Sequence, residues 1–185
     1  VLLSESIILS LFERGAFTSN DSLQSSYSLI ALAFGLVAFM LIKILTPSFF
    51  ARQEPKKPMY VALFSLFLNA ILAWQLAFNL ELGHVGLAIA SSLSAFFTVF
   101  ILLLLLRIEK VYDPSEGWLL LWARLIFASF SLLIFLLFFR EEPSTLRELN
   151  NFWQLFYLLK IVILGIALYL LALRLTGVRI KDFIN

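Results

Sequence analysis

The chain has 185 residues, of which 62% are hydrophobic and only 14% charged, and its mean hydropathy is +0.97. Soluble domains usually carry about a quarter charged residues, so the composition excludes a water-soluble fold and predicts an all-α polytopic membrane protein. The formal net charge of +2 is too small to indicate a nucleic-acid partner. Because the chain has no cysteine, disulfides, thiol nucleophiles and cysteine metal sites are also excluded.

The first apolar segment, residues 1–12, is shorter than the ~20 helical residues that cross a bilayer. It lacks the preceding basic region and following small-residue cleavage site of a signal peptide. We therefore expect it to be the end of a transmembrane helix that begins upstream, in a sequence truncated at that point.

Five longer apolar segments follow, each long enough to span a membrane. They cover residues 25–50, 58–80, 85–106, 118–139 and 152–175. The connectors are short and contain charges or helix breakers, as expected where helices turn at a membrane face. The predicted organisation is three transmembrane helices within residues 13–107, a cytoplasmic loop at 108–117, and two further helices with a cytoplasmic tail in 118–185.

Basic residues divide unevenly between the two sets of connectors. One set contains Arg52, Lys56, Lys57, Arg107, Lys110, Arg174, Arg179 and Lys181, and the other contains Arg14, Arg140 and Arg147 among several acids. Lysine and arginine near span ends are retained in the cytoplasm. The first set is therefore predicted to be cytoplasmic, together with the C-terminus.

The apolar spans offer little for catalysis. No span contains a pair of carboxylates, and His84 lies in a short connector without a second imidazole for a metal site. Ser91, Ser92 and Ser94 share one segment but have no nearby base to activate a nucleophile. The sequence therefore predicts a protein that is not an enzyme and holds no cofactor.

Lys43 is the most informative charge within the spans. An unpaired ammonium at mid-membrane costs ~3 kcal/mol, yet Lys43 lies about two turns from the inner end, where its stem can snorkel to the headgroups. Snorkelling and a role in a transport cavity both remain open, and Arg52 just beyond the same span is a further cavity candidate. Thr46 and Pro47 should bend or end this helix, because proline lacks an amide donor.

Asn69 is a carboxamide deep inside the second span. Its polar group needs a partner away from lipid, either in a hydrogen bond between helices or in contact with an ion or substrate. The third span begins with the small residues GLAIASSLSA at 86–95, which allow another helix to approach closely. Gly35 in the first span and Gly165 in the last permit either close packing of this kind or local bending, and the sequence leaves both open.

Several motifs in this order resemble the MurJ (MviN) family. They are LFERGAFTSND at residues 11–21, GLVAFMLIKILTPSFFARQEPKKP at 35–58, GLAIASSLSA at 86–95 and the C-terminal LRLTGVRIKDF. The resemblance covers essentially the whole chain. It implies the C-terminal part of a fourteen-helix transporter of the MOP exporter superfamily, with the end of helix nine and helices ten to fourteen.

The resemblance also implies a function and a location. Family members translocate lipid II, the lipid-linked peptidoglycan precursor, from the inner to the outer leaflet of the bacterial cytoplasmic (inner) membrane by alternating access. The implied partners are lipid II, membrane lipids and the remaining N-terminal part of the same protein, which carries the family's substrate-binding arginines. The last two helices are expected to border a hydrophobic groove for the polyprenyl tail.

Some family members bind sodium through an Asn, an Asp one turn later and a Thr on the next helix. Here Asn69 matches the first position, Ala73 replaces the carboxylate, and Ser91 stands at the hydroxyl position. Only remnants of a sodium site are therefore expected, and coupling to sodium or to membrane potential stays open. A related polysaccharide-lipid or drug exporter and a non-catalytic membrane scaffold remain as alternatives to the flippase.

Overall fold

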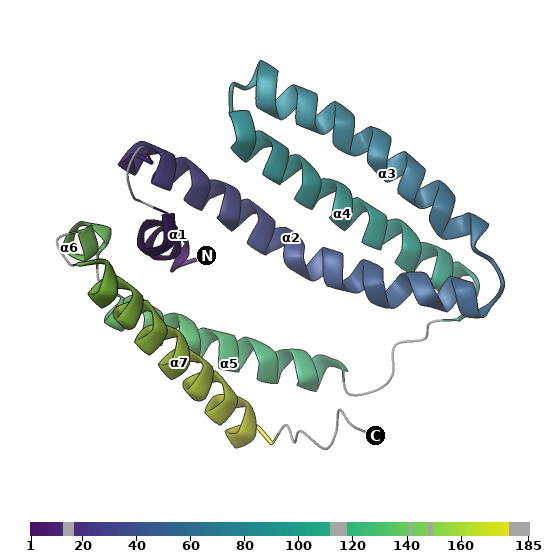
Figure 1. Cartoon of the computed structure of the whole chain (residues 1–185). Helices are drawn as coiled ribbons and strands as arrows, with labels where there is room; N and C mark the ends of the chain where they lie inside the picture. The colour runs from purple at the N-terminus through teal and green to yellow at the C-terminus, as the bar shows by residue number, and fades with distance from the viewer. Residues whose placement is uncertain (13–16, 112–117, 141, 148–149, 178–185) are drawn as a thin grey trace. The chain divides into compact units, whose positions relative to one another are not determined.

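The computed structural model describes residues 1–12, 17–111, 118–140, 142–147 and 150–177, and all regular elements within them are helices (Figure 1). In chain order they are α1 (Ser4–Phe12), α2 (Ser19–Ala51), α3 (Lys56–Trp74), the π-helix η1 (Gln75–Asn79), α4 (Gly83–Ile108), α5 (Trp118–Phe139), α6 (Pro143–Arg147) and α7 (Asn151–Leu175). The connector residues 13–16, most of the loop at 108–117 and the tail that carries Arg179 and Lys181 lie outside the described residues.

Five helical stretches are long and apolar enough to cross a membrane, which confirms the five predicted spans. They are Ser19–Ala51, Lys56–Asn79, Gly83–Ile108, Leu120–Phe139 and Phe152–Leu175. The all-helical fold follows from the membrane environment. The hydrocarbon of a bilayer cannot hydrogen-bond to backbone groups, and a helix satisfies its own backbone hydrogen bonds within one segment.

Helix α2 is longer than the sequence indicated. It begins at Ser19 rather than near residue 25, and it continues through Pro47 to Ala51. Asp21 in its first turn suits the positive end of the helix dipole. Pro47 removes only the amide that would bond to the carbonyl of Lys43, and it lies about one turn before the helix ends, so the helix continues past it.

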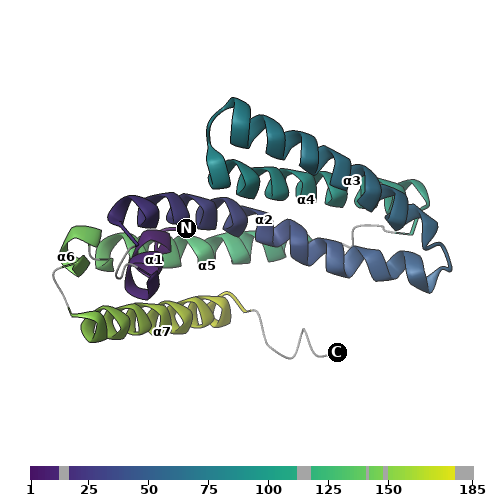
Figure 2. The ribbon, with the colours of Figure 1, turned by 45° about the horizontal axis from the view of Figure 1, so that its top comes forward.

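The chain forms two compact units, α2 to α4 and α1 with α5 to α7. In the first unit α3 and α4 are antiparallel and lie side by side (Figure 2). Gly86 of α4 faces the backbone of η1, where an added Cβ would come within 2.7 Å of the carbonyl carbon of Leu76 and 2.8 Å of the nitrogen of Ala77. The predicted close approach at the small-residue stretch is thus confirmed.

Helix α2 meets α4 at a second close approach. The hydroxyl of Ser92 donates to the carbonyl oxygen of Ala31 at 2.7 Å, and a Cβ on Gly35 would lie 2.3 Å from that Oγ. Further along, a buried apolar cluster joins the three helices of this unit. Its buried members are Ala38, Leu45, Phe49, Val61, Ala95, Val99, Leu102 and Leu106.

Hydroxyl groups link α3 to α4 within the same unit. Ser65 Oγ donates to the carbonyl oxygen of Ser94 at 3.1 Å, and Thr98 Oγ1 lies 2.6 Å from Ser65 Oγ and 2.8 Å from the same carbonyl. Hydrogen bonds of this kind between membrane helices contribute about 0.6 kcal/mol each on average. They fix the face that α3 presents to α4.

In the second unit the short helix α6 joins α1 to the last span. Leu146 of α6 is fully buried, and its carbonyl oxygen accepts a hydrogen bond of 2.9 Å from Nε2 of Gln154 in α7. Arg147 lies 3.8 Å from Glu5 of α1. Tyr157 donates its hydroxyl to the carbonyl oxygen of Phe139 at 2.8 Å, which ties α7 to the end of α5.

We predict that Gly35→Ala lowers the thermal stability of the full-length protein more than Gly165→Ala does. The added methyl group at residue 35 meets Cα and Cβ of Ser92 at 3.0 and 2.8 Å, whereas at residue 165 it meets only the flexible end of Leu132 at 3.2 Å. Overpacking of this kind costs about 1–3 kcal/mol. Thermal unfolding of both variants in detergent measures the difference, and equal stabilities would contradict the close α2–α4 contact.

Candidate functional site

Four charged side chains form a cluster where α2, α3 and α4 end or begin. Arg52 follows α2, Glu54 lies in the turn, Lys57 is in the first turn of α3, and Glu109 caps the end of α4. Arg52 Nη1 donates to Glu109 Oε2, and Lys57 Nζ donates to Glu109 Oε1 at 2.5 Å. Glu54 Oε2 lies 2.8 Å from Lys57 Nζ and 3.5 Å from Arg52 Nη2. One carboxylate therefore bridges two cations across 52 or more residues of sequence.

Two left-handed residues bring these ends of the helices together. Gln53 has φ of 59° two residues after the end of α2, and Lys110 has φ of 54° two residues after the end of α4. A single residue in this conformation commonly ends a helix and turns the chain. The amide of Glu54 then bonds to Phe49 O and that of Val111 to Leu106 O, which satisfies carbonyls at both helix ends.

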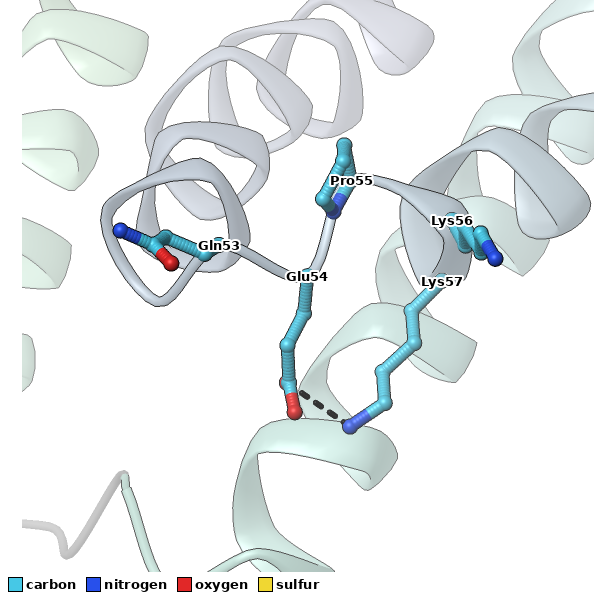
Figure 3. Close-up of a pocket in the computed structure, with 5 residues that line it drawn as sticks. All are labelled: Gln53, Glu54, Pro55, Lys56 and Lys57. Atoms are coloured by element: carbon cyan, nitrogen blue, oxygen red, sulfur yellow. Dashed lines mark hydrogen bonds and ion pairs between the residues drawn. The ribbon is translucent and has the colours of Figure 1, made fainter.

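A cavity of about 400 Å³ lies beside this turn and is lined by Gln53, Glu54, Pro55, Lys56 and Lys57. Figure 3 shows that Glu54 and Lys57 point toward one another across it, while the side chain of Lys56 points away from this pair. The cavity therefore carries both signs of charge. It does not present a purely cationic lining of the kind that selects phosphate groups.

The ion pairs change the proton affinities within the cluster. The hydrogen bonds from Lys57 and then Arg52 hold the pKa of Glu109 below its ordinary value of 4.5. The hydrogen bond to Glu109 raises the pKa of Arg52. Since the side chains are 33% exposed at Arg52 and 18% at Glu109, water and salt partly screen these pairs.

The three residues selected from the sequence lie in different surroundings. Arg52 is paired within the chain, as described above. Lys43 is exposed on α2 and forms no hydrogen bond or ion pair with any residue that the structure describes. Asn69 is half-buried on α3 and likewise has no hydrogen bond among the described residues. The structure thus brings none of the three together.

The two remnants of a sodium site, Asn69 and Ser91, lie on α3 and α4. Ser91 donates its hydroxyl to Leu87 O of its own helix at 2.9 Å, and no hydrogen bond joins it to Asn69. No carboxylate stands one turn after Asn69, where the chain has Ala73. Within the described ranges no three His, Cys, Asp or Glu residues group as metal ligands. The residues present therefore do not fit a sodium site that requires a carboxylate.

Sequence reasoning missed Glu109, the centre of the ion cluster. The only signal was an acid directly beside Lys110 and close to Arg107, which are the two basic residues of that connector. It also missed Ser65 and Thr98, whose hydroxyls connect α3 to α4. Both omissions concern pairing between segments that are distant in sequence.

Comparison with known proteins decides the family. A family model described as "Lipid II flippase MurJ" matches residues 1–173. The chain belongs to this MurJ family. A "Probable lipid II flippase MurJ" of Vibrio cholerae is 36% identical over 98% of the chain, and one of Haemophilus influenzae is 32% identical over 96%.

The likeness to the MurJ family extends to the solved structures. A structure described as "Lipid II flippase MurJ, inward closed conformation" matches 99% of the chain at a TM-score of 0.70 and 27% identity. The chain covers 35% of that structure and 34% of each of the two relatives just named. It is therefore a multi-pass membrane segment of the MurJ fold that spans about a third of these proteins.

We predict that acid removes the stabilisation that Glu109 provides. A carboxylate with a lowered pKa stabilises the fold above its ordinary pKa, and the effect disappears as the pH falls through the lowered value. The thermal stability of the full-length protein should therefore exceed that of Glu109→Gln by a constant amount from about pH 5 to 9, and the difference should shrink toward pH 3.

Thermal unfolding at several pH values, in low and high salt, measures this difference. Salt should reduce it at neutral pH because the pairs are partly exposed. A difference that persists unchanged to pH 3 would show that Glu109 acts through packing rather than charge.

Proposed function

We propose that the full-length protein containing this chain is a lipid II flippase. It moves the lipid-linked peptidoglycan precursor from the inner to the outer leaflet of the bacterial cytoplasmic membrane by alternating access. The observation that supports this most directly is the family match over residues 1–173, with fold similarity over 99% of the chain. The relatives in Vibrio cholerae and Haemophilus influenzae carry the same functional name.

The distribution of charge supports a cytoplasmic position for the ion cluster. Arg52, Lys56, Lys57, Arg107 and Lys110 all lie at the same end of the α2–α4 unit, where two helices end and one begins. Basic residues near span ends favour the cytoplasmic face. With two further spans after this face, the C-terminus is proposed to be cytoplasmic as well.

Within this function we assign Lys43 to the transport pathway. Its ammonium is exposed, has no partner among the described residues and belongs to an apolar helix. An intramembrane charge requires a partner or water, and the anionic part of a lipid-linked precursor provides one. Asn69 is the second candidate, because its half-buried carboxamide also has hydrogen-bonding capacity that the described residues leave unused.

The apolar surface of α5 and α7 suits the lipid part of the cargo. Large exposed side chains on these two helices include Phe130, Phe138, Phe156, Ile163 and Leu170. The helices pack against each other within one unit. We propose that this surface contacts the polyprenyl tail while the polar headgroup moves through the protein.

The function is tested by complementation in cells depleted of their own lipid II flippase. The full-length gene should restore growth, and lipid II in the outer leaflet, assayed directly, should return to normal. Failure of a well-expressed and correctly inserted protein would favour a related exporter of another lipid-linked or drug-like cargo.

We predict that Lys43→Ala reduces lipid II flipping in the full-length protein by about tenfold to a hundredfold. A hydrogen bond to a charged group is worth about 1.5–3 kcal/mol, and each 1.4 kcal/mol changes a rate about tenfold. Lys160→Ala is the matched control, since Lys160 is also an exposed lysine in a span without a partner among the described residues. Normal flipping by Lys43→Ala at normal expression would show that Lys43 only snorkels to the headgroups.

A further inference from the structure

We propose that Glu109 is a positioning residue whose carboxylate clamps the α2–α3 turn onto the end of α4, and that Arg52 serves this clamp rather than a phosphate-bearing ligand. This ion-pair clamp consists of Arg52, Glu54, Lys57 and Glu109. The transport readout of its test rests on the proposed function. The stability readout does not.

The geometry of Glu109 carries the proposal. Each of its carboxylate oxygens binds a different cation, Oε2 with Arg52 and Oε1 with Lys57. Both cations also contact Glu54, so every member of the clamp has two partners of opposite charge. Such a network holds its geometry better than an isolated surface pair, whose contribution is usually negligible.

The clamp also lies where it can fix the angle between helices. On α4 it is about 25 Å from the Ser92 contact with α2, at ~1.5 Å per residue. Between these two attachments the fully buried Phe49 of α2 and the buried Leu106 of α4 belong to one apolar cluster. A single crossing contact allows helices to pivot, whereas a second attachment at the helix end prevents it. The clamp is therefore expected to make α2, α3 and α4 move as one body.

The alternative to the clamp is that Glu109 covers an anion-binding site, and this role predicts different effects of the same substitutions. Glu109 would mask Arg52 and Lys57, and a phosphate-bearing ligand would displace it. In that case the two cations are themselves the functional groups. A clamp instead requires only that opposite charges face each other, whichever helix carries each sign.

The first experiment is a double-mutant cycle on the thermal stability of the full-length protein. Arg52→Gln and Glu109→Gln should each lower the unfolding temperature, and the double variant should lose less than the sum of the two single losses, because the Arg52–Glu109 pair is lost in both. Lys56→Gln is the matched control, because Lys56 lies in the same turn without a partner among the described residues, and it should leave the temperature unchanged. Additive losses for Arg52 and Glu109 would overturn the clamp.

The second experiment exchanges the charges. The variant that inverts all four charges of the clamp (Arg52→Glu, Glu54→Lys, Lys57→Glu and Glu109→Lys) keeps every ion pair attractive. It should therefore recover stability and lipid II transport relative to Arg52→Glu alone. Arg52→Lys keeps the positive charge at residue 52, so it should retain both stability and transport. The proposal would be overturned if the charge-exchanged variant recovered stability but not transport while the unmodified protein was active. That result would show that the cation at residue 52 acts on cargo.

The third experiment uses inorganic pyrophosphate as a probe for the masking role. In Glu109→Gln, pyrophosphate should raise the unfolding temperature no more than it does in Lys56→Gln. A larger rise that disappears when Arg52→Gln is added would mean that Glu109 covers an anion site, against the clamp. If the unmodified protein shows no lipid II transport at all, the proposed function fails, while the stability cycle still decides the role of Glu109.

Discussion

The hydrocarbon interior of a bilayer offers no hydrogen-bonding partner, and this constraint shapes the α2–α4 unit. A polar side chain that faces neither water nor cargo there must find its hydrogen-bonding partner within the protein. Ser92 donates to a carbonyl of α2, and Ser65 and Thr98 form a hydrogen-bonded group with a carbonyl of α4. Because each hydroxyl bonds across a helix interface, the few polar residues determine which faces of the apolar helices meet.

The hydrocarbon of the bilayer also removes the hydrophobic driving force that makes helices associate in water. Lipid tails are as apolar as leucine, so packing depends on van der Waals contact, which small residues allow at short range. Among the described glycines, Gly35 and Gly86 are the two at which an added Cβ would lie within 3.0 Å of the backbone of a neighbouring helix. Charges contribute only where the chain leaves the hydrocarbon, and the cluster around Glu109 lies at such a helix end. Close contacts within the spans and ion pairs beyond them are thus separate means of holding one unit together.

The sequence predicted the properties that a single segment determines. Five spans follow from the length and hydropathy of uninterrupted runs, and the family follows from the order of short motifs. The early start of α2 was not predicted, because serine, asparagine and aspartate near residue 20 are typical of connectors as well as of first helical turns. The pairing of Glu109 with Arg52 could not be inferred either, since a count of basic residues gives the side of the membrane but not the neighbours of each charge.

The structure separates the candidate residues by their neighbours rather than by their chemistry. Arg52 has its charge neutralised by Glu54 and Glu109, so it contributes to the arrangement of the helices. Lys43 carries the same charge but has no such partner among the described residues. A cation in an apolar helix must be satisfied from outside that helix, by water, headgroups or cargo, and for this reason we propose Lys43 for the transport pathway.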